Sequence, residues 1–392
     1  MNGLVLTIRI VLVRSTFAVA RHLRLRRRVV LATAHSPRLA GNLAAIADDL
    51  AARHPEIRVV AIAHRPASGA RGRVVAAWQA VVAAYHLATA RVFIVDDYFF
   101  PIYVVRPRAG TTIIQTWHAC GAFKKVGYSV LDKSFGVDEA LARRVRIHSN
   151  YDVCLVASQS AAPHYAEAFR QPLERFVSRL GIPRTDVFFG EERLASTREA
   201  VRRRYGLTDG RRIVLYAPTF RGDSVTDARA TDDLDLGALA DVLRDTHVVL
   251  VRLHPFIRSR TVVGPELEGF AIDVSDHPDI NELMLVSDVL VTDYSSAIYE
   301  FALLGRPMVF FAPDYEAYEA ERGFYFDYRT GVPGPIFETS EALAEYIRAG
   351  DFDIDQVDRF RAASFDVADG QSAARVTDEL IVPSLAKPAD RP

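Results

Sequence analysis

Short apolar runs rich in β-branched residues recur along the chain, separated by segments with helical spacing. Runs of this length, bounded by turn residues or polar positions, predict buried strands. In the first half of the chain we expect strands at Val29–Thr33, Val59–Ala63, Val92–Val95, Thr111–Thr116 and Val153–Ala157. The intervening segments Ala44–Ala52 and Val74–Ala88 have the spacing of helices. This alternation predicts βαβ units and a parallel sheet.

The alternation stops in a loop-rich stretch that contains GIPRTDVFFG (Gly181–Gly190) and then restarts. The second set of expected strands is Ile213–Ala217, His247–Leu253, Ala271–Val274, Val289–Thr292 and Met308–Phe311. Two successive α/β halves predict two Rossmann-like domains with mainly parallel sheets, facing a central cleft. We place the domains at residues 29–195 and 196–375, with an N-terminal segment at 1–28 and a C-terminal tail at 376–392, of which the last dozen residues look frayed. The polar stretch Arg221–Gly237 predicts a surface loop.

The composition, with 49% apolar and 25% charged residues, is that of a folded globular protein. The net charge of −1 gives no electrostatic reason to expect a nucleic acid partner. Two cysteines, Cys120 and Cys154, are too few for a disulfide framework, which suits a reducing cytosol.

The N-terminus is basic and apolar, and no acidic residue precedes Asp48. Its arginines are Arg9, Arg14, Arg21, Arg24, Arg26, Arg27, Arg28 and Arg38. One interpretation is a peripheral helix in the headgroup plane of an anionic membrane, with its arginines toward the lipid. The alternative is a helix packed on the protein with solvated arginines. A signal peptide does not fit, because the charges follow the apolar part and also interrupt it.

Candidate chemistry lies where predicted strands end. The strand Val289–Thr292 is followed by Asp293, Tyr294, Ser295 and Ser296 and then by a helical segment. Either serine would cap that helix, where free N–H groups and the dipole favour a phosphate. Two ordinary capping serines are the alternative.

Two further strand ends carry hydrogen-bond donors. Arg252 and His254 in LVRLHPF are two residues apart and therefore share one face of the strand, where they could grip a diphosphate. His254 is a second candidate catalytic residue, because a histidine there could protonate or stabilise a leaving phosphate. Thr219 and Arg221 follow another strand in YAPTFR and offer a hydroxyl and a guanidinium. A structural His-Pro turn is the alternative interpretation of the first pair.

The segment QTWHACGAFKKVG (Gln115–Gly127) places His118 at the mouth of a strand. A histidine with an ordinary pKa of about 6.5 is a suitable base for an alcohol at neutral pH. Gly121 lets the backbone approach a ligand closely, and Lys124 and Lys125 would hold a phosphate of the acceptor. The alternative is a buried histidine beside a tryptophan, with solvated lysines.

A metal or cofactor is not expected. No His-Glu-x-x-His or clustered Cys/His pattern occurs, and Asp96-Asp97 and Asp232-Asp233 are isolated pairs. The chain also has no Gly-x-Gly-x-x-Gly and no Walker A motif.

Taken together, these segments resemble the CDP-glycerol glycerophosphotransferase family, which builds teichoic-acid-type poly(alditol phosphate) chains. The resemblance covers most of the chain from about Val29 to Asp327. It rests on QTWHACGAFKKVGY (Gln115–Tyr128), GIPRTD (Gly181–Asp186), YAPTFR, RLHPF, SDVLVTDYSSAIYEFALLGRPMVFFAPD (Ser287–Asp314) and YEAYEAERGFYFD (Tyr315–Asp327). Many members have glycine after the Trp-His pair, whereas this chain has Ala119.

The resemblance implies a GT-B-like fold, with an acceptor-side N-terminal domain and a C-terminal domain that binds the CDP donor. It also implies a peripheral protein at the cytoplasmic face of the membrane. An alditol phosphate, glycerol phosphate being the first expectation and ribitol remaining open, would pass from the CDP-alditol to a hydroxyl of a lipid-linked, phosphate-bearing acceptor, releasing CMP. The resemblance makes His118 the base for that hydroxyl. It assigns donor binding to Thr219, Arg221, Arg252, His254, Asp293, Ser295 and Ser296, with Glu300 on the ribose.

Two other functions fit the same features. A GT-B sugar transferase or epimerase that uses a nucleotide-activated sugar would have the same two domains, since a fold does not fix its chemistry. A non-catalytic scaffold on the membrane surface would need neither base nor donor site.

Overall fold

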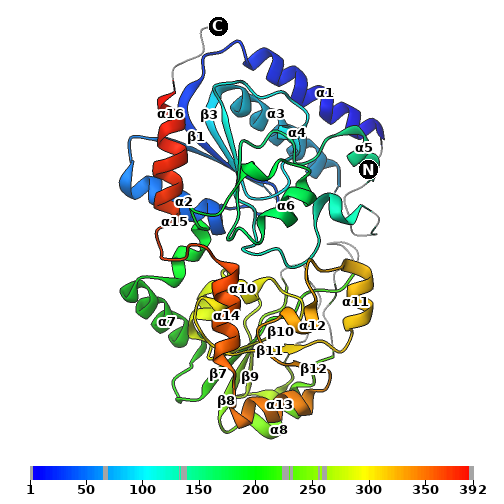
Figure 1. Cartoon of the computed structure of the whole chain (residues 1–392), viewed down its shortest axis with the longest axis vertical. Coiled ribbons are helices and arrows are strands. Elements are labelled where there is room, and N and C mark those ends of the chain that lie inside the picture. Colours follow the sequence, from blue (N-terminus) through cyan, green and yellow to red (C-terminus); the bar gives the residue numbers. More distant parts are fainter. Residues whose placement is uncertain are drawn as a thin grey trace.

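The molecule consists of two α/β lobes stacked along its long axis (Figure 1). This computed structural model describes residues 3–64, 69–131, 133, 139–222, 229, 233–254, 257 and 263–387. In that part of the chain each lobe contains one six-stranded parallel sheet. The predicted fold class, two Rossmann-like units with parallel sheets, is therefore confirmed.

The sheet of the N-terminal lobe has the strand order β2-β1-β3-β4-β5-β6. Its strands are β1 (Arg26–Thr33), β2 (Arg58–Ala63), β3 (Ala90–Val95), β4 (Thr112–Gln115), β5 (Val153–Leu155) and β6 (Phe176–Val177). The first five confirm the predicted strands, whereas two residues are too few to give β6 a recognisable pattern. Every residue of β3 is buried, as expected for a strand covered on both faces.

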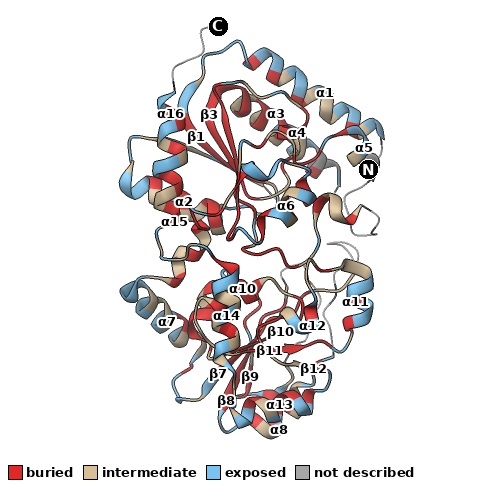
Figure 2. Cartoon of the chain, viewed as in Figure 1, coloured by how far each residue is buried: buried red, intermediate tan, exposed pale blue. Residues whose placement is uncertain are grey.

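The sheet of the C-terminal lobe has the strand order β12-β11-β10-β7-β8-β9. Its strands are β7 (Arg212–Tyr216), β8 (His247–Val251), β9 (Ala271–Asp273), β10 (Val289–Thr292), β11 (Met308–Phe311) and β12 (Ile336–Phe337). Only β12, again two residues long, was not predicted. Both sheets are buried between helices whose outer faces are exposed (Figure 2).

Helices surround both sheets. In the N-terminal lobe these are α1 (Gly3–Ala20), α2 (Gly41–Arg53), α3 (Gly69–Thr89), α4 (Phe100–Tyr103), α5 (Glu139–Arg144) and α6 (Ala162–Phe169), with short turns η1 (Gly127–Val130), η2 (Leu173–Arg175) and η3 (Pro183–Phe188). Then come α7 (Glu191–Tyr205), α8 (Leu236–Leu243), η4 (Pro265–Leu267), α9 (Ile280–Val286), α10 (Ala297–Ala302), α11 (Tyr315–Arg322), α12 (Tyr328–Gly331), α13 (Ser340–Ala349) and α14 (Ile354–Ser364). The two helical segments predicted from spacing lie within α2 and α3.

Helix α1 packs against α3 and also presents apolar side chains to solvent. Leu6, Val13 and Phe17 are buried, whereas Val11 is 56% exposed and Val19 is 75% exposed. Within the described residues α1 is the one helix whose length and composition would suffice to cross a membrane. The two interpretations of the N-terminus are thus not exclusive, because the helix packs on the protein and still exposes an apolar stripe.

The C-terminal segment returns to the N-terminal lobe, where α16 lies beside β1 (Figure 1). It comprises α15 (Ser372–Val376), the π-helical turn η5 (Thr377–Ile381) and α16 (Val382–Ala386). We expected a C-terminal tail from residue 376, frayed over its last dozen residues, but Ile381 and Leu385 are buried. This difference arises because the segment completes a hydrophobic core that the local sequence does not reveal.

Some predictions concern residues outside the described part of the chain. Most of the loop predicted at Arg221–Gly237 falls there, as do Asp232 and the Pro-Phe pair at positions 255–256 of RLHPF. The last five positions, 388–392, fall there as well.

Candidate active site

His118 follows β4 on a backbone held in an uncommon conformation. Trp117 has a φ of +55°, a left-handed value that is costly for a bulky side chain. Its N–H donates to Oε1 of Gln115 at 2.8 Å. Its carbonyl accepts from Nδ2 of Asn42 at 2.9 Å. The indole stacks on the His118 imidazole with ring centroids 4.5 Å apart, so these contacts together fix the position of the histidine.

Two residues from other strand ends surround the imidazole. His118 Nδ1 lies 3.7 Å from Oδ1 of Asp97, which follows β3. Nδ1 of His35, which follows β1, lies 3.2 Å from Oδ2 of the same carboxylate. Parallel strands thus bring His35, Asp97 and His118 to one edge of the sheet, although they are far apart in sequence.

The protonation of this cluster favours a neutral His118. Desolvation lowers the pKa of His118 below its ordinary value, and the positive charges of His35 and Arg184 lower it further against the opposing effect of Asp97. Desolvation also lowers the pKa of His35, but the hydrogen bond to Asp97 and the negative charges of Asp96 and Asp97 outweigh this effect. The pKa of His35 is therefore raised. At neutral pH the His118 imidazole is therefore unprotonated and can accept a proton, and its side chain is 46% exposed.

The Asp96 carboxyl beside this cluster is held partly protonated near neutral pH. Burial raises the pKa of Asp96 to about 6, despite the opposing charge of His35. Desolvation also raises the pKa of Asp97, but the positive charges of His118 and His35 and the hydrogen bond to His35 outweigh it. The pKa of Asp97 is therefore lowered. Asp97, the carboxylate nearest the His118 ring, is therefore fully ionised at neutral pH, whereas Asp96 is mostly ionised and takes up a proton at mildly acidic pH.

An ion pair connects this cluster to the C-terminal lobe. Nε of Arg184, in η3, lies 3.1 Å from Oε1 of Glu300 in α10. Arg184 also donates a hydrogen bond to the carbonyl of His118. The second carboxylate oxygen of Glu300 is buried and has no hydrogen-bond partner among the described residues. The Trp-His segment and the segment after the two serines therefore meet at the junction of the lobes, as the sequence predicted.

Gly121 is required by packing between the lobes. A Cβ atom at this position would lie 2.1 Å from the ring of Tyr299, in α10. The carbonyl of Gly121 accepts a hydrogen bond from the Tyr165 hydroxyl at 3.0 Å. We expected this glycine to let the backbone approach an acceptor, but its close neighbour is a side chain of the other lobe.

The two lysines after Gly121 also contact the C-terminal lobe. Nζ of Lys124 donates to the Tyr318 hydroxyl at 3.1 Å. The N–H of Lys125 donates to the carbonyl of Gly323 at 3.1 Å, while its side chain is exposed. The basic groups thus lie at the edge of the lobe junction.

The predicted donor residues Thr219, Arg221 and Asp293 form one buried network. Asp293, 2% exposed, accepts hydrogen bonds from the Thr219 hydroxyl at 2.9 Å and from Arg221 Nη1 at 2.9 Å. Arg221 also bonds Asp314 through Nε at 2.7 Å. Burial lowers the pKa of Arg221, but the charges of Asp293 and Asp314 and their hydrogen bonds outweigh this effect. The pKa of Arg221 is therefore raised. In this structure Arg221 therefore pairs with one buried acid, Asp293, and one partly exposed acid, Asp314, and joins the loop after β10 to the segment after β11.

The remaining donor candidates lie at the carboxyl ends of β8 and β10. The Ser295 hydroxyl accepts from the N–H of Ala297 at 3.3 Å, whereas the Ser296 side chain makes no capping bond. Arg252 is buried and donates from Nη1 to the carbonyl of Leu253 at 2.8 Å. The His254 ring lies 4.8 Å from the Phe220 ring. These side chains thus follow two strands of one sheet, β8 and β10, which have β7 between them.

Sequence reasoning missed four residues of this site. Asp97 appeared only as half of an isolated acidic pair, and His35, Arg184 and Asp314 were given no role. The available signal was position, since Asp97 and His35 directly follow predicted strands of the same parallel sheet. No group of three or more metal-ligating side chains occurs among the described residues, and both cysteines are buried thiols.

Comparison with known proteins places the chain in a functional context. Residues 15–382 match the family model described as CDP-Glycerol:Poly(glycerophosphate) glycerophosphotransferase. The chain is 38% identical over 353 residues to the teichoic acid ribitol-phosphate primase of Bacillus spizizenii strain W23, covering 90% of each protein. It is 37% identical over 308 residues to the teichoic acid poly(ribitol-phosphate) polymerase of that strain, covering 78% of this chain and 49% of the polymerase. A solved structure of the wall teichoic acid polymerase TagF has the same fold, with a TM-score of 0.76, 22% identity and coverage of 98% and 95%.

Proposed function

The chain belongs to the CDP-glycerol:poly(glycerophosphate) glycerophosphotransferase family, and from that premise we propose its reaction and site. It transfers an alditol phosphate from a CDP-alditol to a hydroxyl of a lipid-linked, phosphate-bearing acceptor in teichoic-acid-type synthesis. Because the two relatives above act with ribitol phosphate, CDP-ribitol is the first donor to test, and CDP-glycerol is the second.

The observation that carries this proposal is the position of His118 at the junction of the lobes, with its Nδ1 3.7 Å from Oδ1 of Asp97 and its carbonyl bonded to Arg184. The lowered pKa of His118 agrees with a role as base. The acceptor oxygen attacks the β-phosphorus of the CDP-alditol while the bond from that phosphorus to the CMP oxygen breaks. His118 takes the proton of the attacking hydroxyl, and CMP leaves with the bridging oxygen. In such a reaction the protein contributes positioning and stabilisation of spreading negative charge.

The donor binds on the C-terminal lobe in this proposal. Arg252 and His254 contact its diphosphate, and Ser295 and Ser296 add hydrogen-bond donors at the start of α10. Thr219, Arg221 and Asp293 support that loop, and Glu300 accepts a ribose hydroxyl in this proposal, which the unpartnered second oxygen of its carboxylate supports. Lys124 and Lys125 remain candidates for the phosphate of the acceptor, and Gly121 contributes the close contact between the lobes.

The test is release of nucleotide from several donors. Purified protein and a lipid acceptor are incubated with CDP-ribitol, CDP-glycerol or a UDP-sugar, and CMP, UDP and the product mass are measured. CMP release with a mass increase of one or more alditol phosphates is expected. UDP release would instead support a sugar transferase or epimerase, and no release together with no thermal stabilisation by CMP would support a scaffold.

The pH dependence of kcat/KM should reflect the protonation of His118 and the effect of Asp97 on it. Activity as kcat/KM is expected to fall as the pH drops through the lowered pKa of His118, because protonation removes the base. Asp97→Asn removes the charge that favours the imidazolium, although His35, Arg184 and Asp96 remain close. The acidic limb should therefore move down by about one pH unit, with a lower kcat. Profiles from pH 5 to 8 measure this, and a loss of activity with an unmoved limb would contradict it.

We also propose that the protein binds the cytoplasmic face of the membrane as a peripheral protein. Apolar side chains of α1 and α3 are exposed as a stripe that includes Val19 at 75% and Trp78 at 64%. The arginines that follow α1 complement anionic headgroups.

A charge reversal on the stripe tests this membrane contact. Val11→Glu combined with Val19→Glu places two negative charges against an anionic surface and removes two apolar contacts. Partition onto phosphatidylglycerol vesicles should fall by at least about tenfold, since each charge near such a surface is worth about 1 kcal/mol. Leu173→Glu, an exposed apolar position on η2, is the matched control in vesicle pelleting. Equal pelleting of all three proteins would argue against the contact.

A further inference from the structure

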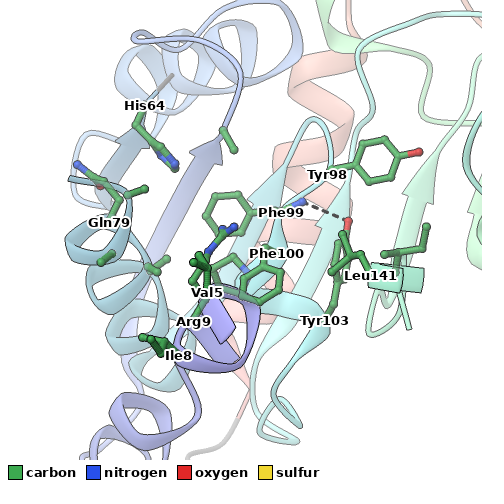
Figure 3. Close-up of a pocket in the computed structure, with 17 residues that line it drawn as sticks. Val5, Ile8, Arg9, His64, Gln79, Tyr98, Phe99, Phe100, Tyr103 and Leu141 are labelled. Atoms are coloured by element: carbon green, nitrogen blue, oxygen red, sulfur yellow. Dashed lines mark hydrogen bonds between the residues drawn. The ribbon is translucent and has the colours of Figure 1, made fainter. Parts of the chain in front are cut away.

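An apolar cavity lies at the carboxyl edge of the N-terminal sheet, between α1, α3 and α4 (Figure 3). Its volume of about 630 Å³ is within the range of ligand pockets, roughly 300–1,000 Å³. It begins directly behind three strand ends, since Ala34 follows β1, His64 follows β2 and Tyr98 lies three residues after β3. This edge is the usual place for a ligand in an open parallel sheet.

The walls of the cavity are mainly hydrocarbon. Val5 and Ile8 of α1, Ala80 and Ala83 of α3, and Phe100 of α4 all line it. Figure 3 shows Val5, Ile8 and Phe100 among the side chains around the cavity. Protein interiors are otherwise packed with few voids larger than a water molecule. A space of this size with such walls is complementary to an apolar ligand.

One end of the cavity carries a positive charge. The guanidinium carbon of Arg9 lies 4.5 Å from the centroid of the Phe100 ring, inside the apolar wall. Burial lowers the pKa of Arg9. The pKa of His64 is also lowered, first by burial and then by the positive charge of Arg9. Nδ1 of His64 is buried without a hydrogen-bond partner among the described residues. A ligand with both a hydrocarbon chain and an anionic group would complement these two features.

The cavity lies beside two features that matter for the proposed reaction. Its outer side is formed by α1 and α3, next to the exposed side chains Leu4 (67%) and Val74 (70%). On its inner side, Ala34 and Tyr98 are the direct neighbours of His35 and Asp97. The hydrocarbon-lined space therefore lies between the apolar helix faces and the cluster around His118.

We propose that this cavity holds part of the hydrocarbon chain of the lipid-linked acceptor, with Arg9 beside the phosphate attached to that chain. This assignment rests on the proposed function and adds a binding site for the lipid to it. The chain leaves the membrane between α1 and α3, and its headgroup is directed toward the strand ends. A bulk membrane phospholipid is the competing occupant.

Filling the cavity provides the test. Ala80→Phe occupies the space that the chain would use, and Ala80→Ser, which keeps the small side chain, is the matched control. Activity is measured with two acceptors that share one headgroup, one with a long polyprenyl chain and one with a short, water-soluble chain. For the long-chain acceptor, Ala80→Phe should lower kcat/KM by about tenfold or more, since each displaced methylene corresponds to about fourfold. With the short-chain acceptor all three proteins should be equal.

A binding measurement separates this proposal from the proposed function. Farnesyl phosphate should raise the unfolding midpoint of the wild type and of Ala80→Ser but not of Ala80→Phe, while inorganic phosphate should raise none. Stabilisation with no CMP release from any donor would leave the lipid site standing and overturn the reaction. The lipid site would be overturned if Ala80→Phe lowered kcat/KM equally with both acceptors, or with neither. It would also be overturned if dihexanoyl phosphatidylglycerol raised the unfolding midpoint as much as farnesyl phosphate does.

Discussion

Replacing His118 by alanine should lower kcat by about 10²–10⁴-fold at saturating donor, the usual contribution of a general base. In the proposed reaction the imidazole, which stacks on the Trp117 ring and has a lowered pKa, takes the proton of the acceptor hydroxyl. Initial rates of CMP release measure the effect. The unfolding midpoint should hardly change, because the side chain is 46% exposed.

The control for this variant is His54→Ala, at the end of α2, whose imidazole lies near Glu56 and Asp378. Its rate of CMP release should equal that of the wild type. A folded His118→Ala protein with nearly full activity at saturating donor would rule out the role of His118 as the base.

The second large effect concerns stability. Asp293→Ala should lower the free energy of unfolding by about 3–5 kcal/mol, the usual cost of removing one partner from a buried ion pair. Asp293 is 2% exposed and accepts hydrogen bonds from Thr219, Arg221 and the N–H of Tyr294. Its removal leaves these donors without their acceptor, although Asp314 still pairs with Arg221.

Denaturant unfolding at pH 7 measures this loss. Asp241→Ala, at an exposed position of α8, is the matched control and should change stability by no more than about 0.5 kcal/mol. A similar small change for Asp293→Ala would contradict the structural role of the network. Donor binding should be lost as well, since the loop after β10 depends on these contacts.

The strands could be predicted because a buried strand of a parallel sheet has a strong local signal. A β-branched run such as Val289–Thr292 is recognisable without knowledge of its neighbours. The same runs showed where each strand ends, and His118, Asp293 and Arg252 were found from those ends. Two-residue strands such as β12 have no comparable signal.

Contacts between the lobes could not be predicted, because they join segments whose local patterns are independent. Nothing in GIPRTD indicates that Arg184 pairs with Glu300, or that Tyr299 covers Gly121. Arg221 shows the same limit. Its place after a predicted strand suggested a guanidinium that binds the donor, whereas its partners in this structure are Asp293 and Asp314.

The helix α16 packs on the N-terminal lobe although it follows the whole C-terminal lobe in sequence. The backbone therefore passes between the lobes twice, once before α7 and once before α15. Two covalent links limit how far the lobes can separate, so in the proposed reaction the nucleotide would enter and be enclosed by rotation of one lobe about these links. Because α1 belongs to the lobe that would rest on the bilayer, the C-terminal lobe would be the part that swings, and it would do so in the cytosol.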